Sequence, residues 1–320
     1  MSKTKLPQYD FDTVIMGGGP AGYTAGLYAA RAGLKTMLVE GAATVSQITI
    51  TDLIENYPGI PDGINGFDLM QLFKNQALKF GLETQAKDVS AIKNDASSPV
   101  IWDVTLGDKS FKTLSVIAAT GAQWRKLGVP GEEEFAGKGV SYCATCDGPF
   151  YKNKDVVVVG GGDTAIQEAL FLTHFAKKVI VVHRRDRLRA AGILQKRAFA
   201  EKKIEFAWKA NLAQVIGRDF VTGIKIADVQ SGKTSEISAE GVFIFVGRIP
   251  HTDFFQGLLK VDGGGYIITD DNMRTSAAGI FAAGDCRAKQ FRQVITAAGD
   301  GANAAFSAEL YIANIKGEAY

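Results

Sequence analysis

The sequence contains few cysteines, no long apolar run and little net charge. Three cysteines in 320 residues are too few for the disulfide framework of a small secreted protein. No apolar run reaches the roughly 18 residues that suggest a membrane-spanning helix. The polar segment from Met1 to Asp12 lacks the apolar core of a secretory signal. We therefore expect a cytoplasmic protein that does not associate with a membrane.

The formal net charge of +2 argues against a nucleic-acid-binding surface. A metal site is not expected either, because the three histidines and the third cysteine, Cys286, lack the ligand spacing of a zinc site. The hydrophobic fraction of 46% and the 36 glycines indicate a globular α/β protein with many turns. The length favours two domains.

The first informative motif is a pair of cysteines, Cys143 and Cys146, that are separated by two residues and followed by Asp147. Two thiols this close form a small-ring disulfide that opens and closes reversibly, which suits electron transfer. Asp147 could give or take the proton that thiol chemistry needs. The alternatives are a reduced structural pair or half of a zinc site, for which the other ligands are missing.

A glycine-rich turn stands at residues 17–22 (Gly-Gly-Gly-Pro-Ala-Gly). It follows a short apolar strand pattern at 12–16 and precedes a helical pattern at 23–32, and a second apolar run, 35–39, ends at Glu40. Strand, Gly-x-Gly-x-x-Gly, helix and acid together form a dinucleotide fingerprint, in which the helix N-terminus faces the phosphates. A plain glycine turn is the alternative, and the surrounding elements disfavour it.

The pattern repeats after the cysteines. A strand pattern at 155–159 leads into the turn 160–165 (Gly-Gly-Gly-Asp-Thr-Ala), a helical pattern follows at 166–175, and a strand pattern at 178–182 ends at His183. Glu40 and His183 each lie 23 positions after the first glycine of their turn. The two units therefore share one register and have the size of a βαβ unit.

The two units differ in charge at the end of the second strand. An acid such as Glu40 favours a free ribose 2′-hydroxyl, whereas arginines such as Arg184 and Arg185 accept a 2′-phosphate. The first unit therefore predicts an FAD or NAD site and the second predicts an NADPH site. A solvated basic turn is the alternative for the arginines.

The remaining patterns complete the two units. Apolar strand patterns at 116–121 and 242–247 echo each other, and we expect a domain boundary near 120–130. Residues 128–134, with three glutamates, resemble a surface connection. A strand at 279–285 ends in Gly-Asp, where the aspartate suits a flavin ribityl hydroxyl, and 294–312 has helical spacing.

In this order, the two fingerprints, the Cys-Ala-Thr-Cys-Asp-Gly motif, the His-Arg-Arg-Asp run and the Ala-Gly-Asp strand closely resemble the bacterial-type, low-molecular-weight thioredoxin reductases. The resemblance runs from about Asp12 to about Tyr311. It implies two Rossmann-like, three-layer β/β/α domains of the class II pyridine nucleotide-disulfide oxidoreductases. It also implies a homodimer, with a split FAD domain at 1–122 and 252–320 and an NADPH domain carrying the dithiol at 123–251.

The resemblance implies a role for each motif. Cys146 would meet the flavin, Cys143 would attack the disulfide of thioredoxin, and Asp147 would serve as the acid–base residue. The FAD contacts carried over from the family would be Gly17, Gly18, Gly19, Pro20, Ala21, Glu40, Gln47, Asn56, Val89, Asp285, Arg292 and Gln293. The NADPH contacts would be Gly162, Asp163, Thr164, Ala165, His183, Arg184, Arg185 and Arg189.

The chain departs from the family pattern at two places. Val45 and Ser46 stand where the family usually has two glycines, before Gln47, which affects the close approach of the backbone to the flavin. Cys286 stands where an apolar residue usually follows the Gly-Asp pair. We expect Cys286 to be a buried structural thiol, because no neighbour in the sequence could pair with it.

Two other functions remain open from the sequence. A related flavin disulfide reductase could feed a peroxidase or a glutaredoxin-like partner in place of thioredoxin. A flavoprotein that senses redox state could use the dithiol to switch a binding surface, although the sequence supplies no effector element.

Overall fold

The computed structural model describes residues 6–42, 46–51, 53–95 and 98–318. The chain divides into two compact units: residues 1–123 and 249–320 form unit 1, and residues 124–248 form unit 2. Two short strands, β7 (Ala122–Trp124) and β16 (Arg248–Pro250), connect the units and pair with each other. No helix in the described ranges is both long enough and apolar enough to cross a membrane.

Unit 1 is built on a seven-stranded sheet of order β3-β2-β1-β6-β5-β4, with one further strand beside β6. Five strands are parallel: β1 (Phe11–Met16), β2 (Thr36–Val39), β3 (Glu83–Gln85), β6 (Lys109–Ala118) and β17 (Ile280–Ala282). Strands β4 (Val89–Asn94) and β5 (Trp102–Leu106) continue antiparallel from β6. The first glycine-rich turn follows β1, at the centre of the parallel strands.

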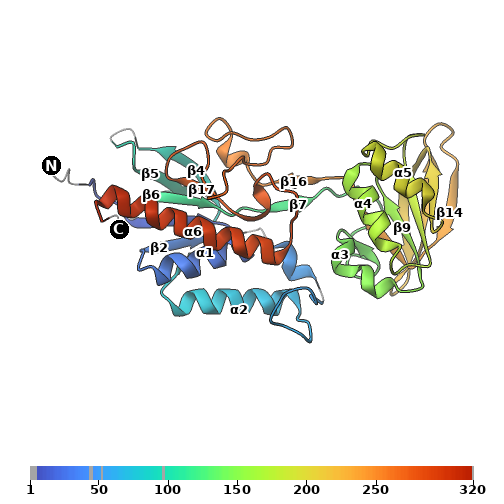
Figure 1. Ribbon diagram of the computed structural model, residues 1–320, viewed down its shortest axis with the longest axis horizontal. Helices are drawn as coiled ribbons and strands as arrows, with labels where there is room; N and C mark the ends of the chain where they lie inside the picture. Colours follow the sequence, from blue (N-terminus) through green and yellow to red (C-terminus); the bar gives the residue numbers. More distant parts are fainter. Residues whose placement is uncertain (1–5, 43–45, 52, 96–97, 319–320) are drawn as a thin grey trace. The chain divides into compact units, whose positions relative to one another are not determined.

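Helices cover one face of this sheet. α1 (Pro20–Arg31) and the long α6 (Val294–Lys316) run side by side, and α2 (Gly66–Lys79) packs against α1 (Figure 1). Helices α1 and α6 can approach closely because Gly301 of α6 has no side chain. A Cβ on Gly301 would lie 2.2 Å from the carbonyl oxygen of Ala21 in α1. Short 3-10 turns complete the unit, η1 (Gln47–Ile50), η3 (Asp253–Phe255) and η4 (Gly284–Cys286).

Unit 2 repeats the design around a parallel sheet of order β11-β10-β9-β15-β8. Its strands are β8 (Val140–Ser141), β9 (Asp155–Val159), β10 (Lys178–His183), β11 (Ile204–Trp208) and β15 (Gly241–Ile244). The helices are α3 (Ala144–Asp147), α4 (Asp163–Leu172) and α5 (Gly192–Ala200), with the 3-10 turn η2 (Gly148–Tyr151). An antiparallel sheet of β12 (Ala210–Gly217), β13 (Val221–Asp228) and β14 (Thr234–Ser238) forms the third layer (Figure 1).

The central strands are buried on both faces, which explains their unbroken apolar runs. In β9, Val156 and Val158 pack with the helices, and Val157 and Val159 pack toward the antiparallel strands. Alternate residues of a strand point to opposite faces, so one strand contributes to two cores. Unit 1 likewise has one core at its helical face and a second at the opposite face. The expected three-layer β/β/α class is confirmed.

Two details correct the sequence analysis. The connection at 128–134 is not wholly a surface segment, because Glu132 is completely buried while Glu133 and Glu134 are exposed. The last helix continues to Lys316, past the expected end at 312, because the helix stops only at Gly317, whose positive φ of 71° allows a left-handed cap.

Candidate functional site

The Cys143–Cys146 pair lies at the start of α3, directly after strand β8. The two residues form a disulfide with their Cα atoms 5.3 Å apart. Cys143 is the N-cap of α3, and its Sγ accepts a hydrogen bond of 3.2 Å from the N–H of Cys146. The hydroxyl of Thr145 lies 3.3 Å from the same sulfur. Such donors favour a thiolate on Cys143 once the disulfide is reduced.

Asp147 is held close to the pair by Ser141. The Ser141 hydroxyl lies 2.5 Å from Oδ2 of Asp147 and 3.3 Å from the carbonyl oxygen of Cys143, and it accepts a 3.1 Å hydrogen bond from the N–H of Cys143. Burial, followed by the negative charge of Asp147, raises the pKa of Tyr151 to about 12. An acid tied to the dithiol loop in this way can exchange protons with the thiols.

The first glycine-rich turn forms an anion cradle at the N-terminus of α1. Gly17 has a φ of +115°, and a Cβ on it would lie 2.2 Å from the carbonyl oxygen of Ala119. Gly22 lies so close to the turn that a Cβ added to it would be 1.8 Å from the carbonyl oxygen of Gly17. The N-cap Gly19 has no side-chain cap, and Pro20 begins the helix, so backbone donors remain for a ligand phosphate. The residues therefore fit a dinucleotide pyrophosphate.

Glu40 lies beside this turn at the end of β2. A Cβ on Gly18 would lie 3.3 Å from the Glu40 side chain. Oε1 of Glu40 accepts a 2.7 Å hydrogen bond from the Tyr23 hydroxyl and lies 2.8 Å from Nζ of Lys74. Burial and the neighbouring Glu40 raise the pKa of Tyr23 far above its usual range. Glu40 therefore lies where the fingerprint places a ribose-binding acid.

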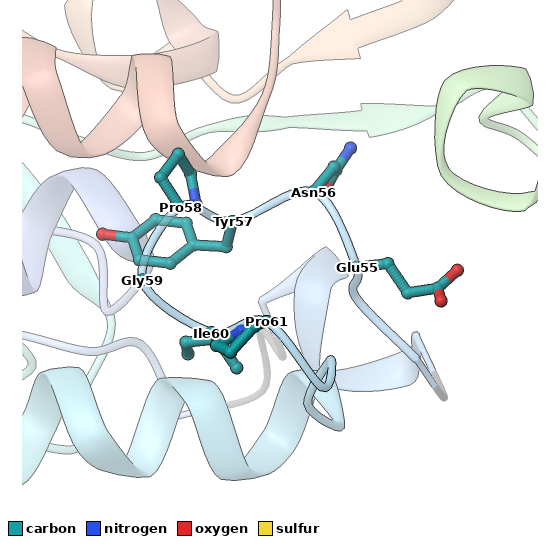
Figure 2. Close-up of a pocket in the computed structure, with 7 residues that line it drawn as sticks. All are labelled: Glu55, Asn56, Tyr57, Pro58, Gly59, Ile60 and Pro61. Atoms are coloured by element: carbon teal, nitrogen blue, oxygen red, sulfur yellow. The ribbon is translucent and has the colours of Figure 1, made fainter.

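Three more of the expected FAD residues make hydrogen bonds within unit 1, and two of them bond to each other. Nδ2 of Asn56 donates to Oε1 of Gln293 across 3.2 Å, and Gln293 begins α6 with a capping box. Gln47 donates to the carbonyl oxygen of Ala122. Asn56 belongs to the loop 55–61, which encloses an open hollow. The side chain of Asn56 points away from that of Ile60 (Figure 2).

Asp285 and Arg292 belong to a cluster of charged groups at the C-terminal end of β17. Nζ of Lys289 lies 2.9 Å from Asp300 and 3.9 Å from Asp285, and Nη1 of Arg287 lies 3.0 Å from Asp300. The guanidinium of Arg292 lies over the ring of Tyr266 at 4.2 Å, and its buried Nε has no hydrogen-bond partner. This cluster fixes the Gly-Asp turn with a buried polar network.

The other residues expected at the FAD site differ in how much of each is accessible. Ala21 is buried against α6, so only its backbone is available to a ligand, and the same holds for Val89, whose side chain packs in the core. Val45 lies outside the described residues. Ser46 lies beside the first turn, with its Oγ 3.5 Å from the position of a Cβ on Gly19.

Cys286 is unpaired and completely buried, as expected of a structural thiol. Burial raises the pKa of its thiol. Among the described side chains, no group of three or more histidines, cysteines or acids could hold a metal ion.

The second glycine-rich turn lies at the N-terminus of α4 in unit 2. The N-cap Gly162 has no side-chain cap, so the backbone donors of this helix also remain for an anion. Gly161 must lack a side chain, because a Cβ would lie 2.5 Å from the ring of His183. Burial lowers the pKa of His183, whose Nε2 is buried without a hydrogen-bond partner. His183 is therefore a neutral ring packed on the turn.

The arginine run is tied to the same turn. The N–H of Arg189 donates to the carbonyl oxygen of Gly161 at 2.7 Å, and Nη2 of Arg189 lies 3.4 Å from the position of a Cβ on Gly162. Oδ1 of Asp163 accepts from the N–H of Ala191 at 2.6 Å. Among the remaining NADPH candidates, Arg184, Arg185 and Thr164 are exposed and Ala165 is buried. A cationic turn beside an open anion cradle fits a phosphorylated nucleotide.

Together, the two dinucleotide cradles and the cysteine pair define a class of protein. The pyridine nucleotide-disulphide oxidoreductase family matches residues 11–301, so the chain belongs to this family.

Within that family the chain is a member of the thioredoxin reductases, as the motif order predicted. It is 47% identical to the thioredoxin reductase of Listeria monocytogenes, over 96% of this chain and 95% of that one. It is 46% identical to that of Treponema pallidum, over 95% and 97% of the two chains. The crystal structure of the Streptococcus pyogenes thioredoxin reductase has a TM-score of 0.89 and 46% identity, with 95% and 98% of the chains covered. The chain is thus an oxidoreductase with a redox cysteine pair.

Several residues around the site were missed by the sequence analysis. They are the buried Glu132, the half-buried Glu168 on α4, and the cluster formed by Arg287, Lys289 and Asp300. Only the i, i+4 spacing of Asp285 and Lys289 gave a signal in the sequence.

Proposed function

We propose that the protein reduces the disulfide of a thioredoxin with electrons from NADPH, through FAD and the Cys143–Cys146 pair. The observation that carries the proposal is the disulfide in the dithiol loop, which belongs to the same unit as the arginine-flanked anion cradle. When bound, NADPH would supply a hydride, and FAD would pass its two electrons to the disulfide.

The cofactors are assigned to the units by the charge at each cradle. We assign FAD to residues 1–122 and 252–320, whose cradle lies beside Glu40, and NADPH to residues 123–251, whose cradle lies beside the arginine run. Backbone N–H groups at the start of α1 and of α4 would hold the phosphates. Arg184, Arg185 and Arg189 would hold the 2′-phosphate, and Glu40 would accept hydrogen bonds from a ribose.

The dithiol would transfer two electrons to the partner in two exchange steps. The Cys143 thiolate attacks one sulfur of the partner's disulfide, and the partner's other sulfur leaves as a thiolate. The Cys146 thiolate then attacks Cys143, which restores the Cys143–Cys146 disulfide and releases the partner as a dithiol. The two protons of the enzyme dithiol pass to the two sulfurs of the partner, and Asp147 would carry them by accepting a proton from an enzyme thiol and giving it to the partner's leaving thiolate.

The partner, the assembly and the compartment belong to the proposal as well. The names of the relatives favour a thioredoxin as the substrate. A homodimer in the cytoplasm is what we expect of a member of this family. A peroxidase-linked or glutaredoxin-like partner is the alternative acceptor, and it would leave the chemistry of the dithiol unchanged.

The test is the Cys143→Ser variant of the full-length flavoprotein, with Cys286→Ala as the matched control. We expect Cys143→Ser to lose all turnover with thioredoxin while NADPH still bleaches the flavin under anaerobic conditions. The control should keep both activities, because Cys286 is buried and unpaired. Full thioredoxin turnover by Cys143→Ser would refute the proposed route.

A further inference from the structure

Arg248 stands at the end of a stack of planar groups that leads to the dithiol loop. Its guanidinium carbon lies 3.7 Å from the centre of the Trp124 ring. The Trp124 ring in turn stacks on Tyr142, with 6.0 Å between the centroids and 17° between the planes. Tyr142 is the residue directly before Cys143. All four residues belong to unit 2.

The hydroxyl of Tyr142 is anchored as well as its ring. The Tyr142 hydroxyl donates to Oε1 of the fully buried Glu132 at 2.8 Å. The same carboxylate accepts hydrogen bonds from three successive backbone N–H groups, those of Leu127, Gly128 and Val129. A buried carboxylate with this many donors is held in one position. Tyr142 is therefore held both at its ring and at its hydroxyl.

The same arginine also influences a half-buried acid on α4. Glu168 projects from α4 and is half-buried. The positive charge of Arg248 attracts this carboxylate, and its Oε2 is buried without a hydrogen-bond partner. Burial raises the pKa of Glu168, while Arg248 and the Ala144 N–H oppose the rise.

We propose that Arg248 is a positioning residue for the dithiol, which holds Tyr142, the residue directly before Cys143, through the ring of Trp124. This deepens the proposed function, since it concerns the same cysteine pair. An arginine suits this task, because its guanidinium is planar enough to stack on an aromatic face and always carries a positive charge. A lysine would supply the charge without the flat surface.

The property that positioning controls is the equilibrium between dithiol and disulfide. Closing the Cys143–Cys146 bond releases two electrons and two protons, and it is favoured when the backbone holds the two sulfurs near each other. When Tyr142 is no longer held, the backbone around Cys143 samples more conformations, so the closed disulfide becomes less stable relative to the dithiol. The reduction potential of the pair should therefore rise when Arg248 is replaced.

The experiment measures that potential in the full-length flavoprotein without NADPH or thioredoxin. Each variant is equilibrated with mixtures of reduced and oxidised dithiothreitol, the thiols are trapped by alkylation, and the peptide with Cys143 and Cys146 is quantified by mass spectrometry. The variants are Arg248→Ala, Arg248→Lys and Trp124→Leu. Arg31→Ala is the matched control, because Arg31 lies over the ring of Phe80 at 5.3 Å, in unit 1.

We expect Arg248→Ala to shift the dithiol–disulfide equilibrium about tenfold toward the dithiol, which equals about 30 mV for this two-electron couple. Arg248→Lys should recover part of the shift and Arg31→Ala should cause none. The double variant Arg248→Ala/Trp124→Leu should shift the equilibrium by less than the sum of the two single shifts, because both substitutions break the same stack. A potential for Arg248→Ala equal to that of Arg31→Ala would overturn the proposal.

A second variant and the absence of substrates keep the potential measurement interpretable. If Arg248→Ala fails to fold, Trp124→Leu alone must shift the equilibrium in the same direction, and an unchanged value would overturn the proposal. Because neither NADPH nor thioredoxin is present, a protein that fails to turn over thioredoxin still gives a potential. Failure of the proposed function and failure of this inference are therefore distinguishable.

Discussion

Replacing Tyr142 separates two contacts that the structure gives to one side chain. Tyr142→Phe removes the 2.8 Å hydrogen bond to Glu132 and leaves the ring on Trp124. Tyr142→Leu removes both contacts. The accepting carboxylate is completely buried, so water cannot easily replace the lost donor. Both variants should therefore destabilise the segment around the dithiol, the leucine variant more than the phenylalanine variant.

The size of each loss follows from the kind of contact. A hydrogen bond to a charged group contributes about 1.5–3 kcal/mol, and an aromatic pair contributes a further ~0.5–1.5 kcal/mol beyond the area it buries. Tyr142→Phe should thus lower the opening free energy of the segment by about 1.5–3 kcal/mol. Tyr142→Leu should lower it by the same amount plus the aromatic contribution and the loss of buried area.

Native-state hydrogen exchange of the full-length protein measures this locally, which matters because a chain of two units need not unfold in one step. The amides of Leu127, Gly128 and Val129 report directly, since they donate to Glu132. At about 1.4 kcal/mol per tenfold change, they should exchange about 10 to 150 times faster in Tyr142→Phe. Tyr28→Phe is the control, because Tyr28 is 48% exposed. Unchanged exchange in Tyr142→Phe would refute the anchoring role of Glu132.

Three further predictions test the cofactor cradles and the buried thiol. Gly22→Ala should yield protein purified without the visible absorption of flavin, because a Cβ on Gly22 would lie 1.8 Å from a backbone oxygen. Gly299→Ala, with nothing within 4 Å of its Cβ, should stay yellow. Arg185→Ala should raise the KM for NADPH about 10-fold or more and leave the KM for NADH unchanged, because a charge-assisted hydrogen bond contributes ~1.5–3 kcal/mol. The control Arg197→Ala, at an exposed position, should alter neither KM. Iodoacetamide should not label Cys286 in the native protein at about pH 9 but should label it in urea, because burial raises the pKa of the thiol. Since the unfolded chain loses this proton at lower pH than the native protein, the contribution of Cys286 to stability should fall as the pH rises past 9.0, the ordinary pKa of a cysteine thiol.

The sequence predicted best what depends on local chemistry. The two glycine-rich turns, their strands and helices, and the 23-residue spacing to Glu40 and His183 are all contained in about 30 consecutive residues each. Glycine at such a turn is dictated by a close approach within the same segment, as the 2.5 Å clash of a Cβ on Gly161 with His183 illustrates. The fold class and the family followed from these segments and from the cysteine pair.

The residues that the sequence did not predict depend on contacts between distant segments. Glu132 resembled a surface acid among three glutamates, and only the tertiary structure places it beneath Tyr142 with three backbone donors. Arg248 and Trp124 lie 124 positions apart (248 − 124) and meet only because β7 and β16 pair. Neither periodicity nor motif spacing carries that information.

The most direct test of the central claim is anaerobic oxidation of NADPH by the purified flavoprotein, with and without thioredoxin from the same organism. We predict that NADPH bleaches the flavin once the Cys143–Cys146 disulfide has also been reduced. Thioredoxin should turn this limited reduction into continuous NADPH oxidation, with one thioredoxin dithiol formed for each NADPH consumed. Bleaching without stimulation by thioredoxin would contradict the proposed acceptor. The absence of bleaching would contradict the assignment of NADPH to the cradle beside Arg184 and Arg185.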